Sequence, residues 1–189
     1  PRPGSTGAVV GLGGVGLAAM ITALAHDGVR VIAIDTLASK LETALELGAH
    51  EAMTPEQATE RGVRADTVIE AVGRASVFGF ALSITALGGT TITVGLPAPD
   101  DTIEFAPLGI VAEGRTIIGS YMGSALPSRD IPKFVEMWRA GRLPIERLIT
   151  SHIGLDGLNA AMDDLADGTQ LRQVISFIDD GSGVLDRAS

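Results

Sequence analysis

Short apolar runs alternate with stretches of helical spacing along the first 120 residues of the chain. The short runs are rich in Val, Ile and Thr and predict strands at residues 7–10, 31–34, 67–69, 91–94 and 116–120. Between them, the spacing of apolar side chains predicts helices at residues 17–27, 41–47, 77–87 and 107–113. Strands separated by helices need crossover connections. This order therefore predicts a doubly wound α/β fold, in which a parallel sheet has helices on both faces.

The remaining residues follow a different rhythm. Residues 128–141 and 158–166 have the spacing of amphipathic helices, and Asp156 is expected to cap the second one. Residues 148–153 and 173–178 are expected to be extended. From residue 179 onward the chain is rich in Gly, Ser and Asp, which predicts a flexible tail at residues 179–189.

Composition and charge narrow the class of protein. Hydrophobic residues make up 46% of the chain but aromatic residues only 4%, so the core must be aliphatic, as in buried parallel sheets. The net charge of −9 argues against nucleic acid as a partner. The chain has no cysteine, and no apolar run approaches the roughly 18 residues of a membrane span. We expect a cytoplasmic protein with no membrane partner.

Because the chain begins PRPGST, without methionine or a signal peptide, we also expect that an upstream segment has been removed.

A glycine motif lies between the first predicted strand and the first predicted helix. Gly11, Gly13 and Gly16 form G-x-G-x-x-G, which allows a tight turn, close approach of a pyrophosphate and close packing of helix on strand. The helix N-terminus would then face the phosphates. The motif alone is also compatible with a turn that binds nothing. The candidate pyrophosphate-binding residues are Gly11, Leu12, Gly13, Gly14, Val15 and Gly16.

An acidic residue ends the second predicted strand. Asp35 stands where a carboxylate can accept hydrogen bonds from the adenosine ribose of a dinucleotide, although an Asp after a strand can also cap the next helix. The carboxylate would repel a 2′-phosphate, and residues 36–38 supply no arginine to bind one. Strand, glycine turn, helix, strand and acid in this order favour a Rossmann site for NAD rather than NADP.

Six segments, in this order and spacing, resemble the medium-chain, zinc-type alcohol dehydrogenase family. They are GAVVGLGGVGLAAM, VIAIDTLASKLETALELGAHEAMTP, DTVIEAVGR, TITVGLP, TIIGSYMGS and LITSHIGLDGLNAAMDDLADGTQLRQVISF. The resemblance runs from about Ser5 to Phe177, and GSYMGS and PSRDIP are most similar to the class III-like branch. It implies that residues 1–121 form an NAD-binding Rossmann domain and that residues 122–178 belong to the catalytic domain. It further implies hydride transfer between an alcohol and NAD in the full enzyme, and a homodimer formed through residues 116–120.

The resemblance also implies roles for individual residues. Lys40 matches a lysine near the adenosine ribose, and Arg172 matches an arginine that reaches the pyrophosphate; without the resemblance both would be interpreted as solvated helix charges. The residues that match a loop along the ribose and adenine are Ala71, Val72 and Arg74. Those that match the groups around the nicotinamide carboxamide are Val94, Gly95, Leu96, Ser120 and Met122.

The ligands for zinc are missing. Zinc enzymes of this kind bind the metal through cysteine and histidine, and the chain has no cysteine and no G-H-E segment. His26, His50 and His152 are far apart in sequence and predict no metal site, and no catalytic residue is assigned. In the family the zinc ligands precede the nucleotide-binding domain, so zinc is expected only in a missing N-terminal half. We therefore predict a fragment that binds NAD(H) without oxidising alcohols; the alternative is a stand-alone NAD(H)-binding or sensing module.

Overall fold

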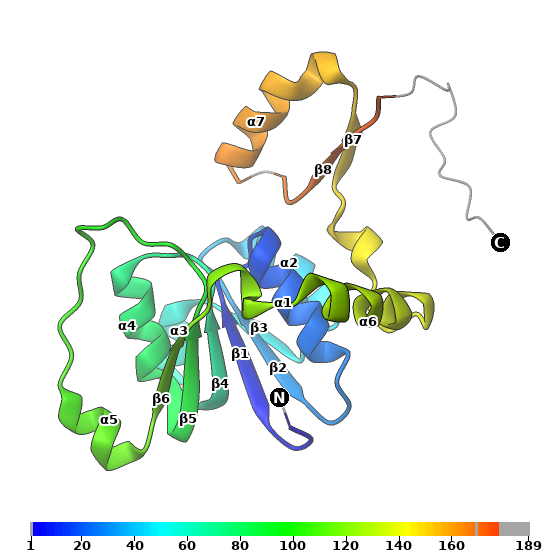
Figure 1. The fold of residues 1–189 in the computed structure, drawn as a ribbon. Coiled ribbons are helices and arrows are strands. Elements are labelled where there is room, and N and C mark those ends of the chain that lie inside the picture. Colours follow the sequence, from blue (N-terminus) through cyan, green and yellow to red (C-terminus); the bar gives the residue numbers. More distant parts are fainter. Residues whose placement is uncertain (1, 169, 178–189) are drawn as a thin grey trace. The chain divides into compact units, whose positions relative to one another are not determined.

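The structure is a computed structural model of the chain and describes residues 2–168 and 170–177 (Figure 1). The chain divides into two compact units, Pro1–Pro144 and Ile145–Ser189. The predicted tail at residues 179–189 lies outside the described residues. None of the helices in the described part of the chain is long and apolar enough to cross a membrane.

A parallel sheet lies at the centre of the first unit. Within the described residues it has six strands in the order β3-β2-β1-β4-β5-β6. Their bounds are β1 Thr6–Val10, β2 Arg30–Ile34, β3 Glu51–Met53, β4 Ala65–Glu70, β5 Thr85–Thr93 and β6 Thr116–Gly119. Every neighbouring pair is parallel. The strand order reverses between β1 and β4, which is the switch point where open α/β sheets bind ligands. The predicted doubly wound α/β fold is confirmed.

Helices connect the strands and cover the sheet. In the first unit they are α1 Gly14–Leu24, α2 Ala38–Glu46, α3 Pro55–Glu60, α4 Ala75–Ser83, α5 Pro107–Glu113 and α6 Pro127–Arg139, with a 3-10 turn at Tyr121–Ser124. Helix α1 contacts β1, β2 and β4, whereas α4 contacts β4 and β5. The short helix predicted at residues 107–113 is present as α5.

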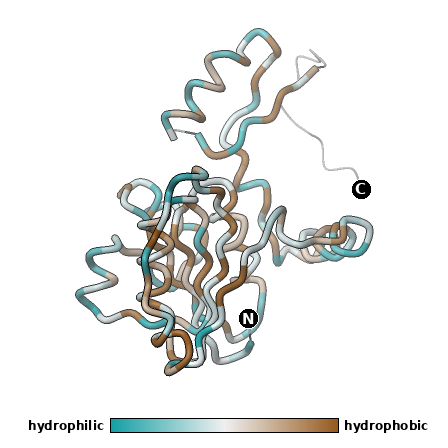
Figure 2. Tube along the Cα trace, turned by 60° about the vertical axis from the view of Figure 1, so that its left-hand side comes forward, coloured by the Kyte–Doolittle hydropathy of each residue, from teal (hydrophilic) through white to brown (hydrophobic). Residues whose placement is uncertain are grey.

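The core is aliphatic, and it lies on both faces of the sheet because successive strand residues point to opposite sides. Val10, Ile34 and Met53 pack in one buried cluster with Ala58 of α3 and Ala81 of α4. On the other face, α1 buries Leu17 and Met20 completely. Figure 2 shows hydrophobic residues concentrated along the strands.

Strand β3 and helix α3 were not predicted. β3 has three residues, too few to show an alternating pattern. Helix α3 has a capping box: the Thr54 side chain accepts a hydrogen bond from the Gln57 N–H (3.3 Å), and Gln57 Oε1 accepts one from the Thr54 N–H (3.0 Å). The sequence T-P-E-Q carries this signal, since a polar cap, a proline and a Gln three residues after the cap are typical of a helix start.

The helix predicted at residues 77–87 is wrong in its last part. Helix α4 ends at Ser83 and β5 begins at Thr85. Buried Thr85 donates its hydroxyl to the Ala81 carbonyl (2.8 Å), and its Oγ1 lies 2.6 Å from Thr91 Oγ1. Gly88 has a φ of +69°, and the register with β4 shifts at this point. A β-branched residue followed by a glycine of positive φ favours a bulged strand over a helix.

Helix α6 begins at Pro127, one residue earlier than predicted, and includes Pro132 in its interior.

In the second unit, α7 Leu158–Ala166 matches its prediction, and β7 Ser151–Ile153 pairs in parallel with β8 Gln173–Ile175. The expected cap at Asp156 is wrong, because that residue belongs to the 3-10 turn Leu155–Gly157 and Gly157 takes the N-cap position. Another 3-10 turn spans Ile145–Leu148. The last strand ends at Ile175, and residue 178 of its predicted range lies outside the described residues.

Candidate cofactor-binding site

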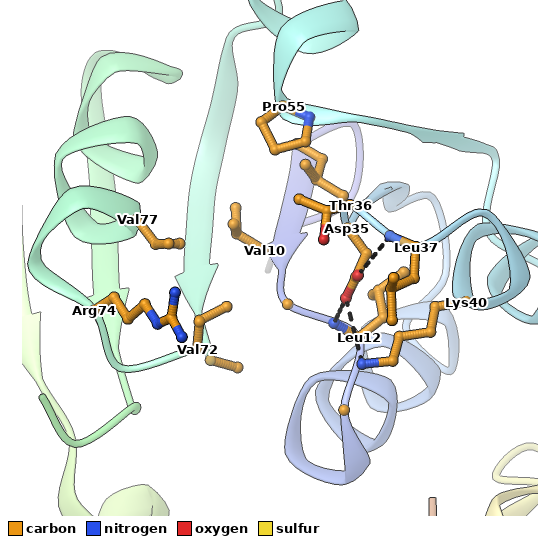
Figure 3. A pocket seen from close by; sticks show the side chains of 14 residues that line it. Val10, Leu12, Asp35, Thr36, Leu37, Lys40, Pro55, Val72, Arg74 and Val77 are labelled. Carbon is orange, nitrogen blue, oxygen red and sulfur yellow. Dashed lines mark hydrogen bonds and ion pairs between the residues drawn. The ribbon is translucent and has the colours of Figure 1, made fainter. Parts of the chain in front are cut away.

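A pocket of about 490 Å³ lies at the carboxyl ends of β1, β2 and β4, at the switch point of the sheet (Figure 3). It is lined by Val10, Gly11, Leu12, Gly13, Ile34, Asp35, Thr36, Leu37, Lys40, Pro55, Ala71, Val72, Arg74 and Val77. Eight of these residues were assigned to a cofactor from the sequence: Gly11, Leu12, Gly13, Asp35, Lys40, Ala71, Val72 and Arg74.

The three glycines of the motif meet different steric requirements. Gly11 has a φ of +90°, which a residue with a side chain rarely adopts. A Cβ on Gly16 would overlap the Gly11 carbonyl oxygen, so this glycine lets α1 start close against the turn. A Cβ on Gly13 would meet nothing within 4 Å. The second glycine therefore leaves open the side of the turn that borders the pocket.

The turn leads directly into the N-terminus of α1. Gly14, Val15 and Gly16 form the first turn of this 11-residue helix, where backbone N–H groups lack intrahelical acceptors. These N–H groups and the positive end of the helix dipole attract anions. A pyrophosphate placed against this turn would find donors without any basic side chain.

Asp35 joins the end of β2 to the glycine turn. Its Oδ2 accepts a hydrogen bond from the Leu12 N–H (2.7 Å), and its Oδ1 accepts one from the Leu37 N–H (3.0 Å). Lys40 Nζ lies 4.0 Å from Oδ2, and the Asp35 side chain is only 9% exposed. Asp35 is not the N-cap of α2, since Leu37 takes that position. The carboxylate is thus held at the pocket wall, where its remaining lone pairs can accept hydrogen bonds from hydroxyl groups.

The opposite wall comes from the loop after β4 and from α4. Figure 3 shows Val72, Arg74 and Val77 across the pocket from Asp35 and Lys40. This pocket, with apolar walls and a few fixed polar groups, has the character of a site for a small organic ligand.

The other assigned residues do not line the pocket. Val94, Gly95 and Leu96 follow β5, and Ser120 and Met122 follow β6, at the same carboxyl edge of the sheet. The Val94 N–H donates to the Glu70 carbonyl (2.9 Å) and the Ser120 N–H to the Thr93 carbonyl (3.0 Å). Met122 is 83% exposed and has a φ of +51°. Arg172 belongs to the second unit, where its carbonyl accepts a hydrogen bond from the Thr150 N–H (2.8 Å).

A buried carboxylate at this edge was missed from the sequence. Glu70, the last residue of β4, is 1% exposed. It accepts hydrogen bonds from the N–H groups of Val72 and Gly73 and from the Thr93 hydroxyl, each at 2.7 Å. A charged residue inside the mainly apolar run TVIEAV was the signal that could have found it, because such residues are seldom buried without a specific partner.

The described residues do not fit a zinc ion. In residues 2–168 and 170–177, no three His, Cys, Asp or Glu side chains are grouped so that they could hold a metal. His26 follows α1, and His152 lies in β7. His50 precedes β3, and its Nδ1 accepts a hydrogen bond from the Val31 N–H (3.1 Å).

Comparison with known proteins finds one family and many relatives. The zinc-binding dehydrogenase family model matches residues 14–140. Geraniol dehydrogenase from Castellaniella defragrans is 34% identical over an alignment of 183 residues, which covers 93% of this chain and 49% of that protein.

Solved structures agree with this relationship. An alcohol dehydrogenase zinc-binding domain protein from Burkholderia ambifaria superposes with a TM-score of 0.85 at 31% identity, covering 92% of this chain and 49% of that one. Benzyl alcohol dehydrogenase from Acinetobacter calcoaceticus superposes with a TM-score of 0.87 at 26% identity, covering 94% and 51%. The chain thus spans about half the length of the relatives that it matches.

Proposed function

Because this chain belongs to the zinc-binding dehydrogenase family, we propose that its first unit binds NAD(H) in the pocket at the carboxyl ends of β1, β2 and β4. The observation that carries this proposal is the convergence of the glycine turn and Asp35 on one pocket, joined by the hydrogen bond from the Leu12 N–H to the Asp35 carboxylate. An anion-binding helix start beside a fixed carboxylate suits a pyrophosphate linked to a ribose.

The parts of the cofactor can be assigned to parts of the site. The pyrophosphate would lie on residues 11–16, and Arg172 stays a candidate for binding it on the resemblance of the sequence alone. The adenosine ribose would bind Asp35 and Lys40, with the loop of Ala71, Val72 and Arg74 along the ribose and adenine. The nicotinamide would lie beside the segments that follow β5 and β6, which comprise Val94, Gly95, Leu96, Ser120 and Met122.

The longer protein is proposed to be an NAD-dependent, zinc-type alcohol dehydrogenase. Its relatives are named as alcohol dehydrogenases or as dehydrogenases of a particular alcohol, and the chain spans about half their length. Because the described residues do not fit zinc, we place the metal in the other half of the longer protein and assign no step of the chemistry through it to this chain. On this proposal residues 1–121 are the NAD-binding domain and residues 122–178 belong to the catalytic domain. The class III-like branch stays a prediction.

A homodimer is proposed with this function. The sheet order ends at β6, so one edge of this strand has no neighbour within the described sheet. Ile117 and Ile118 of β6 are 36% and 43% exposed. An apolar edge strand is prone to pair with another strand, and pairing with a second copy across a two-fold axis would satisfy it.

Cofactor binding is tested by calorimetry with NADH and NADPH on the 189-residue chain, together with metal analysis and NAD reduction by a panel of primary alcohols. We expect NADH to bind, NADPH to bind more weakly, and neither turnover nor stoichiometric zinc. Absence of NADH binding would refute the proposed site. Stoichiometric zinc together with turnover would refute the assignment of the metal to the other half.

Two glycine substitutions distinguish an effect on cofactor binding from an effect on the stability of the fold. Gly13→Ala adds a methyl group in open space beside the pocket, so we expect an unchanged melting temperature and NADH affinity reduced about tenfold because the pyrophosphate can no longer approach. Gly154→Ala, also in open space but in the second unit, is the control and should change neither quantity.

The sequence upstream in the gene distinguishes the stand-alone NAD(H)-binding or sensing module from the enzyme, because only the enzyme has a preceding catalytic half.

A further inference from the structure

The carboxylate of Glu70 is buried at the end of β4 without a cationic partner among the ion pairs of the described residues. Burying a carboxylate is unfavourable unless hydrogen bonds compensate for the lost water. Here the compensation comes from three donors. Oε1 accepts the N–H groups of Val72 and Gly73, and Oε2 accepts the hydroxyl of Thr93.

The main chain of the same residue holds a second loop. The Glu70 carbonyl accepts a hydrogen bond from the Val94 N–H (2.9 Å) and a longer one from the Gly95 N–H (3.4 Å). The side chain and the carbonyl of Glu70 therefore fix two loops, residues 71–74 after β4 and residues 94–96 after β5.

These two loops contact each other through their backbones. A Cβ on Gly73 would lie 2.7 Å from the Leu96 nitrogen, and a Cβ on Gly95 would overlap the backbone nitrogen of Gly73. Gly73 also has a φ of +78°. With no side chains between them, the loops pack directly on each other, and the hydrogen bonds of Glu70 hold both.

The other side of the pocket packs against the loop after β4 at Gly11, where a Cβ would lie 2.4 Å from Val72 Cγ2, but it also has contacts of its own. The glycine turn, Asp35 and Lys40 are connected by their own contacts, namely the Leu12 N–H to Asp35 and the Lys40 ammonium beside it. Glu70 therefore forms hydrogen bonds to one wall of the pocket, whereas Asp35 holds the glycine turn of the other.

We propose that Glu70 is a positioning residue that sets the loop at residues 71–74, proposed to lie along the ribose and adenine, together with the loop at residues 94–96, proposed to lie beside the nicotinamide. This inference rests on the proposed cofactor function. AMP should contact the Asp35 side and the first of these loops, whereas NADH needs both loops in place.

The test compares Glu70→Ala, Glu70→Gln and Thr93→Val. Glu70→Ala removes all three acceptor bonds, and we expect NADH affinity to fall about tenfold or more and AMP affinity to fall by a smaller factor, because AMP contacts only one of the two loops. Gln can accept both N–H groups through its oxygen and donate to the Thr93 hydroxyl through its amide, so Glu70→Gln should restore NADH binding. Thr93→Val, which keeps the shape of the side chain, removes one bond and should have an intermediate effect.

Thr85→Val is the control for loss of stability alone. Thr85 is buried in the same strand as Thr93 and makes its own hydroxyl hydrogen bonds, but it lies at the opposite end of β5 from the pocket. This variant should lower the melting temperature without changing the ratio of NADH to AMP affinity.

Hydrogen exchange of backbone amides tests the same inference without a cofactor. Val72 is 44% exposed, yet the N–H groups of Val72 and Gly73 are both bonded to Glu70. We expect both amides to be protected in the unmodified chain and in Glu70→Gln, and to exchange at least about tenfold faster in Glu70→Ala.

The outcomes separate this inference from the proposed function. Lack of NADH and AMP binding by the unmodified chain would refute the function, and the inference with it. Binding by the unmodified chain with equal losses of NADH and AMP affinity in Glu70→Ala, or unprotected Val72 and Gly73 amides, would refute the role of Glu70 alone. If Glu70→Ala does not fold, an unchanged ratio of NADH to AMP affinity in Thr93→Val would overturn the proposal.

Discussion

Asp35 has a structural role and a proposed binding role at the same time. Its carboxylate holds the N–H groups of Leu12 and Leu37, so it fixes the glycine turn relative to the end of β2. The same side chain lines the pocket and is expected to accept hydrogen bonds from the ribose hydroxyls. Binding and turn geometry are therefore coupled through one residue.

Replacing Asp35 should change both the strength and the choice of cofactor. In Asp35→Ser, loss of charge-assisted hydrogen bonds costs about 1.5 to 3 kcal/mol, so NADH affinity should fall at least about tenfold. The difference between the NADH and NADPH affinities should narrow, because the charge that would repel a 2′-phosphate is gone. Fluorescence titration with both cofactors measures the effect.

Asp66→Ser is a matched control for Asp35→Ser. Asp66 also accepts a backbone hydrogen bond, from the Thr6 N–H at 2.7 Å, but it is absent from the residues that line the pocket. The Asp66→Ser substitution should change the stability of the fold and leave NADH affinity unchanged. An unchanged NADH affinity in Asp35→Ser would show that the ribose role is wrong.

At the scale of one element, the start of α6 depends on a carboxylate inside its first turns. Asp130 binds the Arg129 guanidinium through two hydrogen bonds (2.7 and 2.9 Å) and accepts the Leu126 N–H (2.9 Å). The hydrogen bond from Arg129, followed by that from Leu126, lowers the pKa of Asp130 from its usual 3.8 to about 2. The helix start is thus stabilised by the ionised form.

This pKa predicts acid sensitivity at one end of α6. Because the folded pKa lies below the unfolded value, the stabilisation is complete above pH 3.8 and is lost as the pH falls to about 2. A carboxyl carbon titration followed by NMR should give a midpoint near 2 for Asp130. Asp130→Asn should remove the step. A midpoint near 3.8 would contradict the hydrogen bonds at this helix start.

At the scale of the whole molecule, the two edges of the sheet differ. The edge strand β3 carries Glu51, which forms ion pairs with Arg30 and Arg61. The other edge strand, β6, presents Thr116, Ile117, Ile118 and Gly119, all at least partly exposed. Charged edges resist pairing and apolar edges favour it, so self-association is expected at β6.

Sedimentation velocity at micromolar concentration tests the assembly. We expect the unmodified chain to sediment as a dimer and Ile118→Lys as a monomer, because a charge on the edge strand opposes pairing with a second copy. Arg61→Ala, which removes an ion pair to Glu51 of the opposite edge strand, should remain a dimer. A monomeric unmodified chain would refute pairing through β6.

The alternation of strands and helices, the glycine turn and the position of Asp35 were all predictable from the sequence, because each depends on local spacing. Periodicity reveals an element that is long enough to show it, and a G-x-G-x-x-G motif between a strand and a helix restricts the backbone within six residues. Periodicity did not reveal β3, because three residues are too few to show it. It also failed at Thr85, where a buried side chain and a bulge favour a strand over a helix.

Only the tertiary structure decided what Asp35 and Glu70 bind. The hydrogen bond from Leu12 to Asp35 joins residues 23 positions apart, and that from Thr93 to Glu70 joins another pair with the same separation. Such pairs are set by which strands become neighbours and by which loops meet at the carboxyl edge of the sheet. The sequence by itself determined a Rossmann sheet with a glycine turn and an acid after the second strand. The packing of β1 between β2 and β4 decided that these groups share one pocket, because hydrogen bonding between strands brings their carboxyl ends together.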